Sequence, residues 1–219
     1  MSKSIIDQFV TISDKELENG IKYNPDAKSI DPEQIRGTMV IGKTRRLRVD
    51  WRKVCPEMYD ETDMSRISIN KARSVLTGFD LSGGLYIHGV AGSCKTRCAW
   101  YLMAREFCAG KTIACLDGFE LPMIMRMDFE AQRKRIDNIC ECDVLLIDDI
   151  FKARLTEPQE TLLFEILERR SSHKLPFVIT AQIRLDKEVA KLFTDNGGEL
   201  RFTPISRRIQ ETCAMIPFG

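Results

Sequence analysis

Residues 89–96 read GVAGSCKT, and this short stretch decides the expected fold. It follows an apolar run at residues 84–87, GLYI, that has the composition of a buried strand. After it, residues 98–108 are almost wholly apolar and are closed by Ala109-Gly110, which is typical of a buried helix with a C-terminal glycine. A glycine-rich turn between a strand and a helix matches the phosphate-binding pattern GxxxxGK[ST]. In such a turn, backbone N–H groups and the helix N-terminus cradle phosphate oxygens.

Two side chains of this turn are expected to carry chemistry. Lys95 is predicted to reach the β- and γ-phosphates of a nucleotide, and the Thr96 hydroxyl to bind Mg²⁺. Cys94 stands where the pattern has its second glycine, so the match is degenerate at one position. The alternative is a chance glycine-rich turn. The predicted nucleotide-binding residues are Gly89, Val90, Ala91, Gly92, Ser93, Cys94, Lys95, Thr96 and Arg97.

A second motif, VLLIDD at residues 144–149, is an apolar run that ends in two carboxylates. A parallel strand buried on both faces delivers such carboxylates to the C-terminal edge of the sheet, where phosphates bind. Asp148 is predicted to hold Mg²⁺ together with Thr96, and Asp149 to orient and deprotonate an attacking water. A solvated acidic turn is the alternative for the pair alone. The phosphate-binding turn upstream favours the nucleotide site.

The rest of the chain alternates strand and helix patterns from about residue 83 onward. Further strands are expected at residues 112–116, 143–147, 177–180 and 214–218. Thr156 and Gln159 form a capping-box pattern ahead of a helix with an apolar stripe of 3.6-residue period. This alternation predicts an α/β fold with a parallel sheet.

These motifs resemble the AAA+ ATPases of the DnaC/IstB branch, which are replicative-helicase loaders and transposition helper ATPases, many encoded by phages and mobile elements. The resemblance runs from Cys55 to Phe218 and rests on CPEMY at 55–59, GVAGSCKT, VLLIDDIF at 144–151, LERR at 167–170, VITAQ at 178–182 and SRRI at 206–209. It implies a P-loop NTPase of the AAA+/ASCE class, a three-layer sandwich with a five-stranded parallel sheet in the order 5-1-4-3-2. No helical lid is expected, because the chain stops just after its last strand.

The resemblance also implies further site residues. The family's sensor, usually Asn, falls on Gln182, with Thr180 as a second candidate; a strand-end polar residue without a role is the alternative. The family's arginine finger falls on Arg207 or Arg208, with a surface arginine pair as the alternative. An arginine that acts in trans on a neighbour's γ-phosphate implies a homo-oligomer, a ring or an open spiral.

Composition excludes several other classes of protein. The 219 residues include 33 Lys+Arg and 32 Asp+Glu, so nucleic acid would have to be bound by a local patch. No apolar run approaches the ~18–20 residues that span a bilayer, and no secretory signal is visible. The eight cysteines form no CxxC pair, which favours reduced core thiols in a cytoplasmic protein over a zinc site.

The expected domains are an N-terminal extension, residues 1–53, and an ATPase core, residues 54–219. Residues 43–53, KTRRLRVDWRK, hold six cations and one acid, and we expect this arm to contact DNA or a protein partner, with Trp51 able to stack or dock. Met123, Met125 and Met127 are assigned to the core, with a partner-facing groove as the alternative. The cations between residues 126 and 135 are assigned to a solvated face, with DNA contact as the alternative.

The function that the resemblance implies is a helicase-loader-like ATPase that uses ATP/ADP and Mg²⁺ and engages single-stranded DNA and a replicative helicase. One alternative is a transposition helper that delivers a transposase. Another is a nucleotide-binding adaptor that hydrolyses ATP weakly, which Cys94 favours and the intact Lys95, Thr96, Asp148 and Asp149 oppose.

Overall fold

The computed structural model describes residues 5–8, 50–60, 75, 79, 83–152, 155–185 and 198–218, with only the backbone for 7–8 and 198–203. The chain divides into two compact units, residues 1–62 and 63–219. The CPEMY segment, which we expected to belong to the ATPase core, lies in the first unit. Residues 43–49 of the cationic arm lie outside the described residues.

The first unit contains the short helices η1 (Ile5–Gln8) and α3 (Glu57–Asp60). Trp51 is fully buried, and its indole N–H donates a hydrogen bond to Asp60 Oδ1 at 2.7 Å. The expectation that Trp51 offers a ring for stacking is therefore wrong. Both the apolar ring and its polar N–H are already satisfied inside the protein.

The second unit is built on a five-stranded sheet in the order β2-β3-β4-β1-β5, and its four strand pairs are parallel. The strands are β1 (Gly84–Gly89), β2 (Ile113–Asp117), β3 (Val144–Asp148), β4 (Phe177–Ala181) and β5 (Cys213–Phe218). Read from its other edge, this is the predicted order 5-1-4-3-2, which is confirmed. Residues 144–147 of β3, which lies between β2 and β4, are fully buried, as a strand covered on both faces requires.

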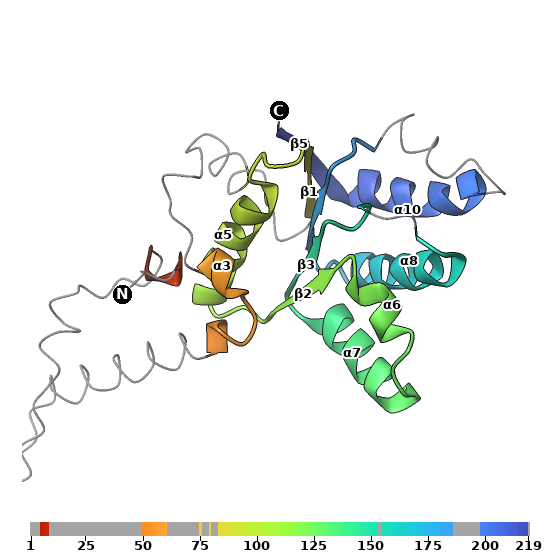
Figure 1. Cartoon of the computed structure of the whole chain (residues 1–219), viewed down its shortest axis with the longest axis horizontal. Helices are drawn as coiled ribbons and strands as arrows, with labels where there is room; N and C mark the ends of the chain where they lie inside the picture. Colours follow the sequence, from red (N-terminus) through yellow and green to blue (C-terminus); the bar gives the residue numbers. More distant parts are fainter. Residues whose placement is uncertain are drawn as a thin grey trace, which may run out of the picture. The chain divides into compact units, whose positions relative to one another are not determined.

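The helices are α5 (Lys95–Cys108), α6 (Glu120–Ile124), α7 (Phe129–Glu141), α8 (Glu157–Ser172) and α10 (Gly198–Thr212). Figure 1 shows α5 on one face of the sheet and α8 and α10 on the other, so that this unit has three layers. This confirms the predicted α/β sandwich. None of the helices in the described ranges is both long enough and apolar enough to span a membrane.

Local sequence signals explain several helix boundaries. The backbone N–H of Thr156 donates to Gln159 Oε1 at 2.9 Å, the reciprocal half of the expected capping box at the start of α8. Asp128 caps α7 by accepting a hydrogen bond from the Ala131 N–H at 2.9 Å. Helix α10 was not predicted from the sequence, and Pro204, a residue that usually breaks helices, lies within it.

The core assignment of the methionine cluster is wrong. Leu121 and Ile124 are buried, whereas Met123, Met125 and Met127 are exposed. Helix α6 is five residues long, so only one side of it can face the sheet while its other residues and the turn after it stay on the surface. The cysteines behave as expected: all eight are free thiols, and five of them are buried.

Candidate nucleotide site

The glycine-rich turn joins β1 to α5 and contains two glycines that its geometry requires. Gly89 has a φ of 149°, and a Cβ added there would lie 1.8 Å from the Phe218 carbonyl oxygen of the neighbouring strand β5. Gly92 has a φ of 78°, in the left-handed region that glycine adopts without a steric penalty. The turn therefore keeps the backbone of a phosphate-binding loop.

Cys94 occupies the position where the pattern has glycine, and it adopts a glycine-like backbone. Its φ is 69° and its ψ is 21°, and it forms the N-cap of α5. A left-handed backbone costs a residue with a Cβ about 1–2 kcal/mol. Its Sγ lies 3.8 Å from the Gly92 carbonyl oxygen, within the loop itself. The loop has thus kept its shape at the expense of local strain.

Lys95 lies inside the loop. The residue is only 5% exposed, and its ammonium donates to the carbonyl oxygens of Gly89 at 2.9 Å and Val90 at 2.8 Å. A longer contact of 3.4 Å reaches the Ser93 hydroxyl. An ammonium held at the centre of a loop of backbone groups is a site to which phosphate oxygens are attracted.

Asp148 ends β3 beside the first turn of α5. The Thr96 hydroxyl donates to Asp148 Oδ1 at 3.0 Å, and the Thr180 hydroxyl from β4 donates to the same oxygen. Burial raises the pKa of Asp148, the two threonine hydrogen bonds oppose that rise, and the nearby carboxylates of Asp149 and Asp117 add to it. Carboxylate and hydroxyl oxygens are the donors that Mg²⁺ takes from proteins, so Thr96 and Asp148 fit this ion.

Asp149 follows β3 in a left-handed backbone conformation, with a φ of 50°. Its backbone N–H donates to the Thr180 hydroxyl oxygen at 2.9 Å. Because the same hydroxyl donates to Asp148, the fully buried Thr180 ties both acids to the end of β4. The sequence analysis names Thr180 only as a second sensor candidate. The β3–β4 register explains its position, because Thr180 and Asp148 are the residues that follow the paired Ile179 and Ile147.

Gln182, the first sensor candidate, lies on the surface just beyond β4. The contacts with Asp148 and Asp149 are made by Thr180 and not by Gln182. Arg97 lies in the first turn of α5, half-buried. The structure therefore brings Lys95, Thr96, Asp148 and Asp149 to one end of the sheet and leaves Gln182 outside that cluster.

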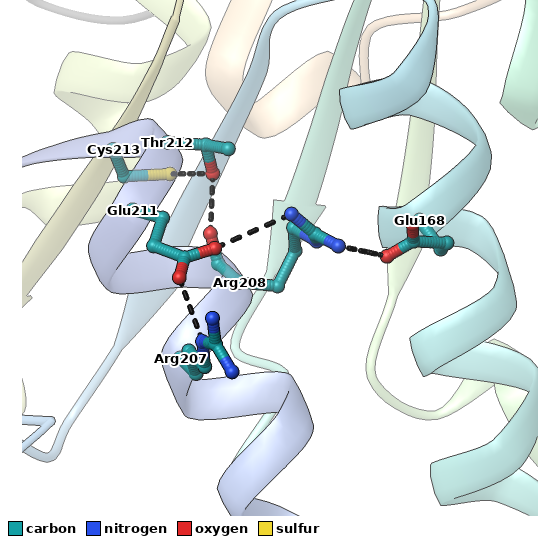
Figure 2. Close-up of polar contacts among 6 residues, drawn as sticks. All are labelled: Glu168, Arg207, Arg208, Glu211, Thr212 and Cys213. Atoms are coloured by element: carbon teal, nitrogen blue, oxygen red, sulfur yellow. Dashed lines mark hydrogen bonds and ion pairs between the residues drawn. The ribbon is translucent and has the colours of Figure 1, made fainter.

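Arg207 and Arg208 lie on α10, where they bond acids of α8 and α10 (Figure 2). Arg208 donates through Nε to Glu168 Oε2 at 2.9 Å, with a second contact from Nη2, and through Nη1 to Glu211 Oε2 at 3.3 Å. Arg207 donates to Glu211 Oε1 at 2.7 Å. The Arg207 side chain is 75% exposed and that of Arg208 is 29% exposed. Arg207 is thus the more available of the two.

The cations between residues 126 and 135, on α7 and in the turn before it, are partly used in the fold. Arg135 forms two hydrogen bonds to Glu120, at 2.7 and 2.9 Å, and a third to the Cys115 carbonyl oxygen at 2.6 Å, so it links α7 to α6 and to β2. Arg126, Arg133 and Lys134 are exposed. No group of His, Cys, Asp and Glu with metal-binding geometry occurs among the described residues.

No protein-family model matches the chain, and no curated protein matches it by sequence. Solved structures do match. The crystal structure of DnaI superposes with a TM-score of 0.60 at 19% identity, over 75% of this chain and 92% of DnaI. The DnaC helicase loader gives 0.52 at 20% identity, over 77% of this chain and 96% of DnaC.

The replication initiator DnaA, bound to AMPPCP and single-stranded DNA, gives a TM-score of 0.54 at 13% identity, over 68% of this chain and 44% of DnaA. These likenesses establish the fold. The chain has the α/β architecture of DnaI, of the DnaC helicase loader and of DnaA, which confirms the expected fold.

Proposed function

We propose that this chain is a Mg²⁺-dependent ATPase that acts as a helicase-loader-like protein in DNA replication. The observation that carries the proposal is the cluster at the C-terminal ends of β1, β3 and β4. There Thr96 and Thr180 both bond Asp148, Thr180 holds Asp149, and Lys95 lies within the adjoining glycine-rich loop. DnaA, which has this fold, is bound to an ATP analogue in its solved structure.

The roles follow from the chemistry of each group. The loop N–H groups and Lys95 bind the phosphates. Thr96 and Asp148 would hold Mg²⁺, which would neutralise phosphate charge when bound. Asp149 orients a water and takes its proton as the water oxygen attacks the γ-phosphorus. The bond from phosphorus to the β–γ bridging oxygen breaks, and ADP and phosphate leave. Thr180 keeps both acids in place.

The test is calorimetric titration of ATP with Mg²⁺, combined with steady-state hydrolysis. Lys95→Ala should lose most of its affinity for ATP, whereas Asp149→Asn should keep affinity and lose turnover. Lys134→Ala, which alters an exposed lysine of α7, is the matched control and should change neither. Equal affinity of wild type and Lys95→Ala for ATP would refute the site assignment.

The proposed partners are a replicative helicase and single-stranded DNA. DnaC is described as a helicase loader, and the DnaA structure contains single-stranded DNA. In this chain the cationic arm at residues 43–53 is the segment that we assign to such a partner. Binding of DNA through it should weaken steeply with salt, because bound phosphates release counterions. A salt-independent affinity, or none, would remove DNA from the proposal.

A nucleotide-stabilised adaptor is the second candidate, and the left-handed Cys94 in the loop favours it. An adaptor binds ATP or ADP, turns over slowly, and acts through protein contacts. A transposition helper shares the same core and differs only in its protein partner. Hydrolysis rates with and without single-stranded DNA separate the ATPase from the adaptor, and identification of the bound helicase or transposase separates the two ATPases.

A further inference from the structure

The backbone at Asp148 and Asp149 is held by a neighbouring turn and by a turn of its own segment. The Gly118 N–H, in the turn between β2 and α6, donates to the Asp148 carbonyl oxygen at 2.9 Å, and a Cβ at Gly118 would lie 2.7 Å from the Asp149 carbonyl oxygen. Within its own segment, the Lys152 N–H donates to that same Asp149 carbonyl oxygen at 3.2 Å and closes the turn over residues 149–152. The β2–α6 turn is thus packed directly against the segment that carries Asp149.

The side chain of Lys152 reaches both partners across this junction. Its Nζ lies 3.7 Å from Asp149 Oδ2 and 5.5 Å from the centroid of the Phe119 ring. Phe119 is fixed at the start of α6, because its N–H donates to Asp117 Oδ1 at 2.8 Å. The ammonium therefore has two anchors, a carboxylate and the face of an aromatic ring, which attracts cations.

We propose that Lys152 is a positioning residue that restrains Asp149, with the Phe119 ring as its second anchor, so that the pair acts as a brake on turnover. The inference rests on the proposed ATPase function. An Asp149 Oδ2 that is paired with Lys152 is engaged by an ammonium and not by the attacking water. Turnover then requires that Asp149 exchange Lys152 for water, and each contact that holds Lys152 in place makes this exchange less favourable.

The brake lies at the surface. The Lys152 side chain is 50% exposed and Phe119 is 57% exposed, so the restraint can be changed without touching the phosphate loop or the Mg²⁺ ligands. An exposed ion pair and an exposed cation–π contact together shift an equilibrium by about 3- to 30-fold. That range is the size of the effect expected on turnover.

Four variants test the brake. Lys152→Met, which keeps length and loses charge, should raise kcat for ATP by about 3- to 30-fold and leave the KM and the equilibrium affinity for ATP unchanged. Phe119→Leu should give a smaller rise, because one anchor remains. Lys152→Arg should restore the wild-type kcat, since a guanidinium bonds carboxylates and stacks on aromatic rings. Lys134→Met is the control for loss of one exposed lysine and should behave as wild type.

A second readout needs no nucleotide. In a proton–carbon NMR spectrum of lysine-labelled protein, the ring current of Phe119 should move the Lys152 ε-methylene protons upfield, and Phe119→Leu should abolish that shift. A Lys152 resonance at the position of solvated lysines, or a Lys152→Met variant whose kcat is unchanged or lower while wild type hydrolyses ATP, would overturn the brake alone. A wild-type protein that binds no ATP would overturn the proposed function, and the brake with it.

Discussion

At the scale of single residues, Cys94 departs most from the pattern it sits in. With a φ of 69° it holds a backbone that glycine adopts at no steric cost. We predict that Cys94→Gly raises the free energy of unfolding by about 0.5–1 kcal/mol, the relieved strain less the entropy that glycine adds to the unfolded chain. It should also raise the rate of ATP turnover, because small displacements at a reacting centre are costly in rate.

Urea unfolding and steady-state hydrolysis measure both effects. Lys174→Gly is the matched control, because Lys174, just after α8, is also a non-glycine residue in the left-handed region, with a φ of 54°. It should gain stability without a change in turnover. A thiol-alkylating reagent should block nucleotide binding in wild type and spare Cys94→Gly. Equal turnover in both proteins, together with binding that alkylation does not affect, would show that Cys94 is a neutral substitution.

Thr180 is the residue that links the two acids, and its loss should be felt in both stability and rate. Thr180→Val keeps the shape and removes the hydroxyl, which leaves the Asp149 N–H without its acceptor and takes from Asp148 one of its two threonine donors, the other being Thr96. A buried group left unsatisfied costs about 1–3 kcal/mol, so the free energy of unfolding should fall by that amount and turnover should fall with it. Thr161→Val, which removes an exposed hydroxyl bonded to the Glu157 carbonyl, should cost far less. Comparable unfolding curves for the two variants would contradict a stabilising role of the Thr180 hydroxyl.

At the scale of elements, β2 and β3 are joined at their starts by one residue pair. The Thr112 N–H and hydroxyl both donate to Asp143 Oδ2 at 2.7 Å, and the Asp143 N–H donates back to the Thr112 hydroxyl oxygen at 2.9 Å. These hydrogen bonds lower the pKa of Asp143 from its ordinary value of 3.8. A lowered folded-state pKa means that the stabilisation is present above the unfolded-state pKa and is lost as the pH falls through the folded-state pKa.

We therefore predict that Thr112→Val lowers the free energy of unfolding by about 1 kcal/mol at pH 7, since the site is solvent-exposed and screened. The difference from wild type should shrink as the pH falls from the ordinary Asp value of 3.8 through the lower folded-state pKa, because below that pKa Asp143 is protonated in both states. Thr112→Ser keeps the hydroxyl and should retain most of the stability. Urea titrations at several pH values measure this, and a pH-independent difference would exclude the carboxylate as its source.

The same scale shows what the sequence could and could not predict. The strands and the cluster of Lys95, Thr96, Asp148 and Asp149 were predictable from the sequence motifs, because parallel strands bring their carboxyl ends to one edge of the sheet. The strand order came only from the family resemblance. The bridge made by Thr180 was harder to predict, since it depends on the register of β4 against β3. The exposure of the α6 methionines depends on the length of a helix that composition does not specify.

The burial of Arg170 could not be predicted from any sequence pattern. It lies in the LERR motif at the end of α8, yet it is fully buried, and its guanidinium donates to the carbonyl oxygens of Ile139, Cys142 and Pro176 at 2.6–2.9 Å. Burial lowers its pKa. A cation can be buried there because the turns before β3 and β4 supply several carbonyl acceptors at once. That convergence is a property of the assembled sheet and not of any segment alone.

At the scale of the whole molecule, replacing either arginine of α10 should have a different effect, and the difference bears on assembly. Arg208 joins α10 to α8 through Glu168, so Arg208→Ala should lower the free energy of unfolding. Arg207 is largely exposed and bonds only Glu211 within its own helix among the described residues, so Arg207→Ala should leave stability near wild type, as exposed ion pairs contribute about 0–1 kcal/mol. If Arg207 serves a neighbouring subunit, its loss should appear in the rate of ATP turnover and not in the unfolding curve.

A trans-acting Arg207 requires a head-to-tail contact that repeats from subunit to subunit, which generates a ring or an open spiral. Specific ATPase activity should then rise with protein concentration. Arg207→Ala and Asp149→Asn, each inactive alone, should regain activity when mixed, because an interface that takes Arg207 from one variant and Asp149 from the other is complete. About a quarter of interfaces are complete at equal, random mixing, and that fraction sets the expected recovery. Arg207→Ala mixed with itself is the control. Hydrolysis that is independent of concentration, with no recovery on mixing, would show that each chain completes its own site and that Arg207 acts, if at all, only within α10.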